Sequence, residues 1–461
     1  MARSRTAVRY ECSDCGAHSP ASLGRCPECG SWGTMSRVEQ PQAALRGAGA
    51  ARSTAGTAAP LSTLTLGEVA TRPLERLPTG ISEVDRVLGG GWTPGGVVLI
   101  AGEPGIGKST LLLQLASHSL GFGRSTLLVA GEEALSQVEM RARRLGVHQG
   151  LELTREYDAR VLAETVAARG PGLVIVDSIQ TLLVEDGATP GSLTQVRDST
   201  ALLTAAAKQA GATLVLIGHV TKEGRLAGPK TVEHMVDVTV SLESAAGYRV
   251  LRSMKNRFGS TGEMGVFEMT SEGMLPVPNP SEAFLAERVP GVAGSVIVAA
   301  LEGQRPLLLE VQALAAKSPY AAPRRVVQGL DNRRVDVVLA VLERRLELPL
   351  SGLDVFVNVA GGLRLTDPGT DLAVALAVYS AVTNRPLPEG TAVAAEVGLA
   401  GELRSVPQLA RRFDEARRTG YERIVGPRGA NISHPVSTLS DAIALSWSDG
   451  PAAAVDHAED V

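Results

Sequence analysis

The stretch GEPGIGKST, residues 102–110, has residue types and a spacing that suit the binding of a phosphate chain. Its glycines let the backbone turn tightly and point successive N–H groups inward, and a helix that follows adds the positive end of its dipole. Lys108 is then placed to reach the β- and γ-phosphates of ATP, and the Ser109 hydroxyl to ligate Mg²⁺. The residues expected to contact the nucleotide are Gly102, Glu103, Pro104, Gly105, Ile106, Gly107, Lys108, Ser109 and Thr110.

An acidic residue further along the chain completes this chemistry. The apolar run LVIV is closed by Asp177. A strand that ends in a carboxylate beside the water shell of Mg²⁺ is the Walker-B pattern. Asp177 is therefore expected to act on the same metal ion as Ser109.

The glycine loop needs a strand before it and a helix after it, and the sequence predicts both. Residues 97–101, VVLIA, are typical of a buried parallel strand, and residues 111–120 are rich in Leu and Ala, which favours a helix. A chance glycine turn is the alternative, and this context disfavours it.

The elements that follow alternate, which predicts an α/β fold. Strands are predicted at residues 126–130, 173–177 and 213–218, and a helix with an Arg-rich face at 136–145. In a doubly wound sheet, ligands gather at the carboxyl ends of the strands. The polar residues at or just after such ends are Lys108, Glu132, Asp177 and His219. Each of them alone could equally be a helix cap or a solvated loop residue, but their shared placement favours one site.

The four cysteines form two C-x-x-C pairs near the N-terminus, Cys12 with Cys15 and Cys26 with Cys29. Two such pairs at short range can hold one tetrahedral Zn²⁺ through four thiolates. Two disulfides are the alternative, which a reducing compartment disfavours. A closed four-thiolate site leaves no position for chemistry, so the expected role of residues 1–36 is structural, in docking or recognition.

Composition limits the class of protein. The 461 residues are 44% hydrophobic and carry a net charge of −4, so any contact with nucleic acid must come from a local basic patch. No apolar run approaches the length of a membrane span, and the N-terminus lacks the apolar segment of a signal peptide, so we expect a cytoplasmic protein without a membrane partner. Residues 37–60 have the composition of a flexible linker, and residues 449–461 that of a disordered tail.

The motifs together resemble a known family. GEPGIGKST, GEEA, VIVDSIQT, GHVTKEG and KNRFGSTGEMGVFEM, preceded by the cysteine pairs, are similar to those of the bacterial RadA (Sms) recombination ATPases, which have a RecA/DnaB-like core. The similarity runs from about Tyr10 to about Pro427, and KNRFG, residues 255–259, is the most specific motif. Without the resemblance, KNRFG would read as a solvated basic loop.

The resemblance implies a RecA-like ATPase domain over residues 61–280 and a homo-hexameric ring with ATP between subunits. Glu132 matches the glutamate that polarises the attacking water, and Glu133 is the weaker candidate; Ala134 replaces the serine usual in the family. Lys255 and Arg257 match a positive pair that would contact the γ-phosphate of the neighbouring subunit.

The resemblance also implies single-stranded and branched DNA as partners, and a RecA-type recombinase. Two loops near the ring axis would touch the DNA, residues 185–194 and 222–231. The second loop offers Lys222, Arg225 and Lys230 for sequence-independent phosphate contacts.

Residues 281–448 resemble the proteolytic domain of Lon, which uses a serine–lysine dyad. The pattern predicts a β-hairpin region over 289–315, helices at 332–346 and 371–383, and a strand at DVFVNVAGG. Laid on the Lon motif, the nucleophile position falls on Gly369 and the lysine position on Ala410, and a nucleophile without a base is inert. We therefore expect a proteolytically inactive domain that serves ring assembly and DNA binding. Its arginines at 324, 325, 333 and 334 form either a basic patch or a salt-bridged surface.

Three functions compete on this basis. The first is a DNA-stimulated ATPase motor that processes recombination intermediates by branch migration during the repair of DNA breaks. The second is a nucleotide-switched RecA-like binding module without translocation. The third is a protease, which the missing dyad disfavours.

Overall fold

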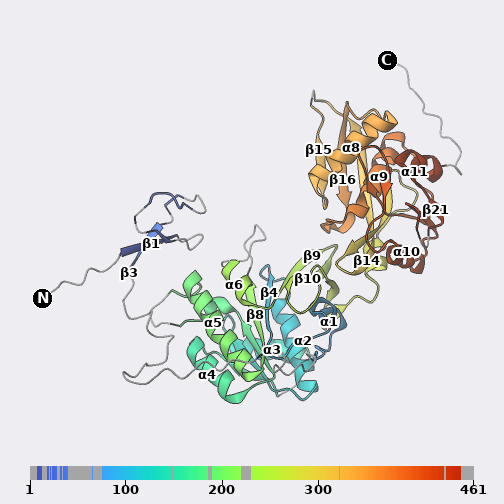
Figure 1. Cartoon of the computed structure of the whole chain (residues 1–461). Helices are drawn as coiled ribbons and strands as arrows, with labels where there is room; N and C mark the ends of the chain where they lie inside the picture. Colours follow the sequence, from blue (N-terminus) through green and yellow to red (C-terminus); the bar gives the residue numbers. More distant parts are fainter. Residues whose placement is uncertain are drawn as a thin grey trace.

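The computed structural model of the chain describes most of the sequence (Figure 1). The described residues are 8–12, 18–19, 21, 23–27, 32–33, 35–39, 65, 75–147, 150–184, 189–219, 230–320, 322–429 and 432–447. The predicted tail at 449–461 lies outside them, as does most of the predicted linker. None of the helices in the described part of the chain is long and apolar enough to cross a membrane.

The N-terminal module contains a small antiparallel sheet with the strand order β2-β1-β3. Its strands are β1 (Val8–Cys12), β2 (His18–Ser19) and β3 (Met35–Glu39). β3 pairs with β1 along its whole length, from Met35 opposite Cys12 to Glu39 opposite Val8. The strand thus extends into the start of the segment that the composition marks as linker.

The central domain, which runs from α1 to β12, is built on a sheet of nine described strands in the order β12-β11-β10-β9-β4-β8-β7-β5-β6. The strands from β9 to β6 in this order are parallel, and β10 to β12 continue the sheet in antiparallel pairing. The bounds are β4 (Val97–Gly102), β5 (Thr126–Ala130), β6 (Glu152–Thr154), β7 (Leu173–Asp177), β8 (Thr213–His219), β9 (Val238–Ala245), β10 (Tyr248–Asn256), β11 (Met264–Thr270) and β12 (Gly273–Pro276). They confirm the strands predicted from the apolar runs, which are fully buried because helices cover both faces of the sheet.

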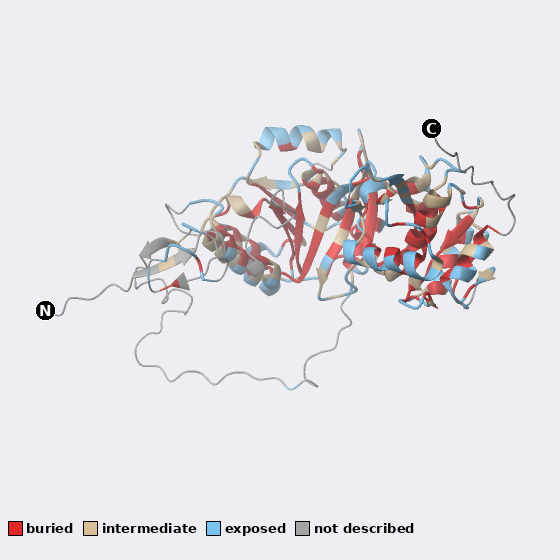
Figure 2. Cartoon of the chain, turned by 90° about the horizontal axis from the view of Figure 1, so that it is seen from above, coloured by how far each residue is buried: buried red, intermediate tan, exposed pale blue. Residues whose placement is uncertain are grey.

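The helices of the central domain lie on the two faces of this sheet. They are α1 (Ser82–Leu88), α2 (Lys108–Gly121), α3 (Leu135–Arg144), α4 (Ala159–Arg169), α5 (Leu193–Ala210) and α6 (Lys230–Met235), with a 3-10 turn η2 (Ile179–Thr181). Residues of α1 and α2 share one apolar core with the sheet, and residues of α4 and α5 share another. Figure 2 shows the buried residues concentrated in the strands and the exposed ones on the outer surfaces of helices.

The C-terminal domain, which runs from α7 to α11, has a sheet of seven described strands in the order β15-β16-β14-β13-β17-β20-β21. Its strands are β13 (Ser295–Glu302), β14 (Arg305–Lys317), β15 (Arg325–Gln328), β16 (Leu353–Val359), β17 (Thr391–Val393), β20 (Arg423–Gly426) and β21 (His434–Pro435), with a separate pair β18 (Glu396–Val397) and β19 (Leu403–Arg404). Its helices are α7 (Pro280–Leu285), α8 (Asn332–Leu346), α9 (Asp371–Thr383), α10 (Leu409–Arg418) and α11 (Leu439–Ser446), with 3-10 turns η3 (Ala360–Gly362) and η4 (Pro368–Thr370). The helices predicted at 332–346 and 371–383 are confirmed, and the predicted hairpin is β13–β14.

The two domains pack directly against each other, because one apolar core contains residues of both. The main core of the C-terminal domain includes Val250 of β10 and Val266 of β11, which belong to the central sheet. Arg305 of β14 forms a buried ion pair with Glu83 of α1, and Glu83 also accepts a hydrogen bond from the Val266 amide at 2.8 Å. These contacts fasten the two domains together beside β10 (Figure 1).

Candidate active site

The glycine loop follows β4 and ends where α2 begins, as the sequence predicts. Gly105 and Gly107 have φ values of 76° and 115°, which residues with a side chain rarely adopt. A Cβ on Gly107 would lie 2.5 Å from the Met269 side chain, and one on Gly102 would lie 2.6 Å from the Leu242 carbonyl oxygen. Backbone shape therefore favours glycine at position 107, and the close contact with a backbone carbonyl requires it at position 102.

The Lys108 side chain is held inside this loop. It is 5% exposed, and its ammonium group donates hydrogen bonds to the carbonyl oxygens of Gly102 and Glu103 at 2.8 and 2.9 Å. Burial lowers the pKa of Lys108, while the nearby Asp177 and Glu132 act to raise it. A cation solvated by neutral carbonyls in a cradle of glycines fits an anionic phosphate chain.

Ser109 and Asp177 meet at the mouth of the loop. The Ser109 hydroxyl, at the start of α2, donates a hydrogen bond of 2.7 Å to the Asp177 carboxylate at the end of β7. Both groups are oxygen donors, which Mg²⁺ prefers. The donor set therefore fits the metal ion expected beside the phosphates.

The two glutamates after β5 have different partners. Glu132 accepts a hydrogen bond of 2.5 Å from the hydroxyl of Ser178, a side chain that is fully buried. Glu133 instead forms an ion pair of 2.7 Å with Arg141 of α3. The structure thus gives the two neighbouring carboxylates different partners, whereas the sequence comparison only favoured Glu132 over Glu133. Ser178, which positions Glu132, was missed because the two residues lie far apart in the chain.

The start of α3 tolerates alanine at position 134, where the family usually has serine. Its amide donates to the side-chain oxygen of Gln137 at 3.1 Å, so a residue of the first turn caps the helix without a hydroxyl at position 134. The contact between Ser178 and Glu132 does not involve Ala134.

Only the first two residues of KNRFG, Lys255 and Asn256, lie in β10, and residues 257–259 follow as a bend in which Arg257 and Gly259 are exposed. The interpretation as a solvated loop is therefore wrong for Lys255 and Asn256, and the cations of the motif make specific contacts. Lys255 lies in β10, and its ammonium group donates to the carbonyl oxygens of Glu233 and Val236 at 2.5 and 2.8 Å, at the end of α6. Burial, followed by the charge of Arg257, lowers the pKa of Lys255. Arg257 donates to the His234 carbonyl oxygen at 3.1 Å.

Arg257 also pairs at 3.3 Å with Asp237, whose carboxylate is almost fully buried. The two cations of KNRFG therefore hold the carboxyl end of α6 within the same chain.

The rest of the motif packs on α1. The Asn256 side chain donates to the Leu88 carbonyl oxygen at 3.2 Å, and the Phe258 ring is packed against the core of the central domain. The Arg76 guanidinium lies 5.5 Å from the centre of that ring. Tertiary contacts, not local charge, decide the conformation of KNRFG.

Comparisons with known proteins agree with this geometry. Residues 65–225 match the family model described as AAA domain, 10–37 the model described as Rubredoxin metal binding domain, and 322–430 the model described as Subunit ChlI of Mg-chelatase. The DNA repair protein RadA of Bacillus subtilis is 42% identical over 93% of this chain and 94% of its own length. Those of Pseudomonas aeruginosa and Escherichia coli are 46% and 42% identical, over 91% and 95% of this chain and 92% and 97% of their own lengths.

The chain belongs to the RadA family of DNA repair proteins. The expected fold class is confirmed: a RecA-like P-loop core, an N-terminal zinc ribbon domain and a ChlI/Lon-like C-terminal domain. Membership in the family and the AAA match support an ATPase that acts in DNA repair. Among solved structures, a KaiC-like protein of Pyrococcus horikoshii is 18% identical with a TM-score of 0.39, over 45% of this chain and 100% of its own.

The residues that the resemblance to RadA assigned to DNA lie mostly beyond the described part. Lys222 and Arg225 are outside the described residues, as are residues 185–188 of the first loop. Lys230 is the first residue of α6, so the second loop ends earlier than predicted. Likewise Leu193 and Thr194, predicted as loop, begin α5. The bounds that the resemblance implied for both loops thus overlap the first residues of these helices.

The RadA zinc site is only partly within the described residues. Cys12 ends β1, and Cys26 is buried. Cys15 and Cys29 lie outside the described residues, so the four-thiolate site stays a prediction. Among the residues that the structure describes, no group of three or more His, Cys, Asp or Glu side chains is arranged to hold a metal ion.

The Lon-like domain has a buried ion pair close to the positions that the resemblance assigned to a dyad. Gly369 is in η4 and Ala410 is in α10. Arg412 and Asp367, with side chains 1% and 4% exposed, pair between these two elements. A Cβ on Gly369 would lie 2.8 Å from the Arg412 guanidinium, so a side chain at position 369 would require this buried pair to shift.

The four arginines of the C-terminal domain do not form one free basic patch. Arg334 pairs at 2.5 Å with Asp371, which is buried. Arg325 donates to the Leu350 carbonyl oxygen at 3.0 Å, and the Arg324 guanidinium lies 4.2 Å from the centre of the Tyr320 ring. Arg333 is exposed. One of the four is therefore ion-paired, one donates to a backbone carbonyl, one lies over an aromatic ring and one is exposed.

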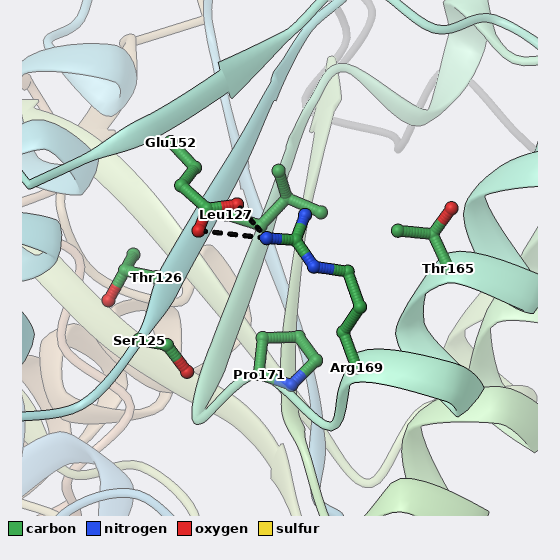
Figure 3. Close-up of a pocket in the computed structure, with 7 residues that line it drawn as sticks. All are labelled: Ser125, Thr126, Leu127, Glu152, Thr165, Arg169 and Pro171. Atoms are coloured by element: carbon green, nitrogen blue, oxygen red, sulfur yellow. Dashed lines mark hydrogen bonds and ion pairs between the residues drawn. The ribbon is translucent and has the colours of Figure 1, made fainter.

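Figure 3 shows a small pocket at the other end of the strands of the central sheet. Its lining residues are Ser125, Thr126, Leu127, Glu152, Thr165, Arg169 and Pro171. Thr126 and Glu152 begin β5 and β6, whereas ligands of such sheets bind at the carboxyl ends of strands. Arg169 and Glu152 pair across the pocket at 2.9 Å.

Proposed function

We propose that this protein is a DNA-dependent ATPase that processes recombination intermediates, as a branch-migration or helicase-like motor on single-stranded and branched DNA, during homologous recombination and the repair of DNA breaks. The observation that carries the proposal is the convergence of the Lys108 cradle, the Ser109–Asp177 pair and the Ser178–Glu132 contact at one edge of the sheet. A cradle alone would bind nucleotide, whereas a positioned carboxylate also supports hydrolysis.

Each residue has a distinct part in the proposed reaction. The backbone of Gly102–Thr110 holds the phosphates, and Lys108 reaches the β- and γ-phosphates. Ser109 and Asp177 would hold Mg²⁺, which neutralises charge on the phosphate oxygens. Glu132 orients the attacking water, and the Ser178 hydroxyl keeps the Glu132 carboxylate in place.

Lys255 and Arg257 are proposed to complete the site of the neighbouring subunit in a homo-hexameric ring. The partners of Lys255 in this chain are carbonyl oxygens at the end of α6, and neutral carbonyls leave its positive charge available to a phosphate. Arg257 donates to the His234 carbonyl oxygen and pairs with the Asp237 carboxylate, so a phosphate would compete with that carboxylate for Arg257. An approaching γ-phosphate would compete for these cations and release the end of α6. This helix begins at Lys230, directly after the segment that holds Lys222 and Arg225, which supports a coupling of hydrolysis to DNA contact.

Further partners follow from the family. We propose that the protein acts in the cytoplasm with a RecA-type recombinase, and that Cys12, Cys15, Cys26 and Cys29 bind Zn²⁺ in a docking module. Membership in a family of DNA repair proteins and the match to a metal binding domain support these proposals.

The test is ATP turnover by the full chain with and without single-stranded DNA, together with displacement of a labelled strand from branched DNA. We expect DNA to stimulate turnover and turnover to drive displacement. Nucleotide-dependent DNA binding without displacement would support the second candidate, a switched binding module. Absence of ATP hydrolysis under all conditions would contradict both the motor and the assignment of the site.

A further inference from the structure

The hairpin that joins β9 to β10 lies between the glycine loop and the C-terminal domain. Successive residues of β10 face different cores, because side chains alternate along a strand. Val250 belongs to the core of the C-terminal domain, and Leu251 to a core of the central domain. Tyr248 packs edge-on against Phe284 of α7, with ring centres 5.8 Å apart. One face of β10 therefore packs in the core of the C-terminal domain and the other face in a core of the central domain.

Arg249 reaches from this strand to the glycine loop. Its side chain lies on the same face of β10 as Leu251, and its Nε donates a hydrogen bond of 3.0 Å to the carbonyl oxygen of Ile106. A second nitrogen donates to the hydroxyl of Ser244 on β9 at 3.1 Å. A charged donor therefore ties the middle of the loop to the hairpin.

The C-terminal domain holds the other side of the same hairpin. The amide of Ala246, in the turn, donates a hydrogen bond of 2.6 Å to the carbonyl oxygen of Gly361. Gly361 lies in η3, directly after β16, with φ of 82°. A Cβ at this position would lie 2.6 Å from the Ala246 Cβ. Gly361 is therefore in direct contact with the turn, and a side chain there would displace it.

We infer that Arg249 is a positioning residue for the phosphate loop, and that the C-terminal domain sets the affinity of the loop for nucleotide through Gly361, Ala246 and Arg249. The inference rests on the proposed function, since it takes the loop as the ATP site. Coupling of this kind is reciprocal, so nucleotide binding also acts on the contact with η3. The Lon-like domain thereby acts on the ATP site through the β9–β10 hairpin.

The first experiment measures the Kd of a fluorescent ADP for the full chain, and kcat and KM for Mg·ATP. We expect Arg249→Ala to raise the Kd and the KM about tenfold, a change typical for losing a hydrogen bond from a charged donor. The kcat should stay within about twofold, because a residue that acts on ground state and transition state alike changes KM alone. Arg249→Lys keeps a charged donor and should recover part of the affinity.

The second experiment tests the contribution of the C-terminal domain. Gly361→Ala should raise the Kd for ADP in the same direction. Gly362→Ala is the matched control, because Gly362 also has a positive φ, of 72°, but a Cβ there meets nothing within 4 Å. The double variant Arg249→Ala/Gly361→Ala should bind ADP no more weakly than Arg249→Ala, since both changes act through one path.

Three results would overturn the inference. Gly361→Ala could bind ADP as well as Gly362→Ala does, or the two effects could add in the double variant, and in either case no path runs through Arg249. Arg249→Ala could lower the melting temperature without changing the Kd, which would make its role purely structural. A wild-type chain that binds no ADP at all would instead refute the proposed function on which the inference rests.

Discussion

Replacing Ser178 by alanine tests whether Glu132 acts in hydrolysis. The hydroxyl is fully buried and donates to the Glu132 carboxylate at 2.5 Å. Removing a hydrogen bond to a charged group costs about 1.5–3 kcal/mol. If the contact holds Glu132 in its working position, that energy is lost in the transition state, and kcat should fall about 10- to 150-fold.

The assay separates this loss from loss of binding. Ser178 contacts the carboxylate and not the glycine loop, so the Kd for ADP should stay unchanged while kcat and kcat/KM fall together. Ser199→Ala is the matched control, because Ser199 is equally buried and its hydroxyl has no hydrogen-bond partner among the described residues. It should hydrolyse ATP like the wild type.

Two outcomes would refute this reasoning. An unchanged kcat in Ser178→Ala would show that the hydrogen bond does not position the carboxylate that matters, and would direct attention to Glu133. An equal loss in Ser199→Ala would show that kcat responds to any change in the buried core.

Three other predictions follow from the site. Lys108→Ala and Asp177→Asn should each abolish ATP hydrolysis with an unchanged circular dichroism spectrum, because both residues act on phosphate charge; retained turnover would remove them from the site. Elemental analysis should find one Zn²⁺ per chain, and Cys26→Ser should release it while ADP binding persists; a chain without zinc would refute the four-thiolate site. Arg257→Ala and Lys255→Ala should each lose DNA-stimulated hydrolysis, by up to the 10³–10⁵-fold that such cations contribute. Mixing Arg257→Ala with Lys108→Ala chains should restore activity where an intact loop faces an intact cation, and mixed rings that stay inactive would exclude a role in trans.

The glycine loop and the strands around it were predictable because their signals are local. Four buried parallel strands appear as continuous apolar runs, and the loop has a fixed spacing that few other structures need. The Walker-B aspartate was predictable for the same reason, since it closes one of these runs.

Other features could not be predicted, because they depend on residues that are distant in the sequence. Nothing near Glu132 indicates that Ser178 donates to it, and nothing near Arg249 indicates that it reaches Ile106. The KNRFG motif reads as an exposed basic loop until its cations are seen at the end of α6.

The sequence by itself therefore determined the nucleotide chemistry, the alternation of strands and helices, and the family, because each is written in short stretches of fixed spacing or in similarity along the chain. Only the tertiary structure decided which carboxylate is positioned by a buried hydroxyl, where the cations of KNRFG are held, and how closely the two domains are joined. The physical reason is that hydrogen bonds, ion pairs and shared cores form between surfaces brought together by folding. The buried pair of Glu83 and Arg305 joins the start of the central domain to the C-terminal domain, and no local pattern marks such a pair.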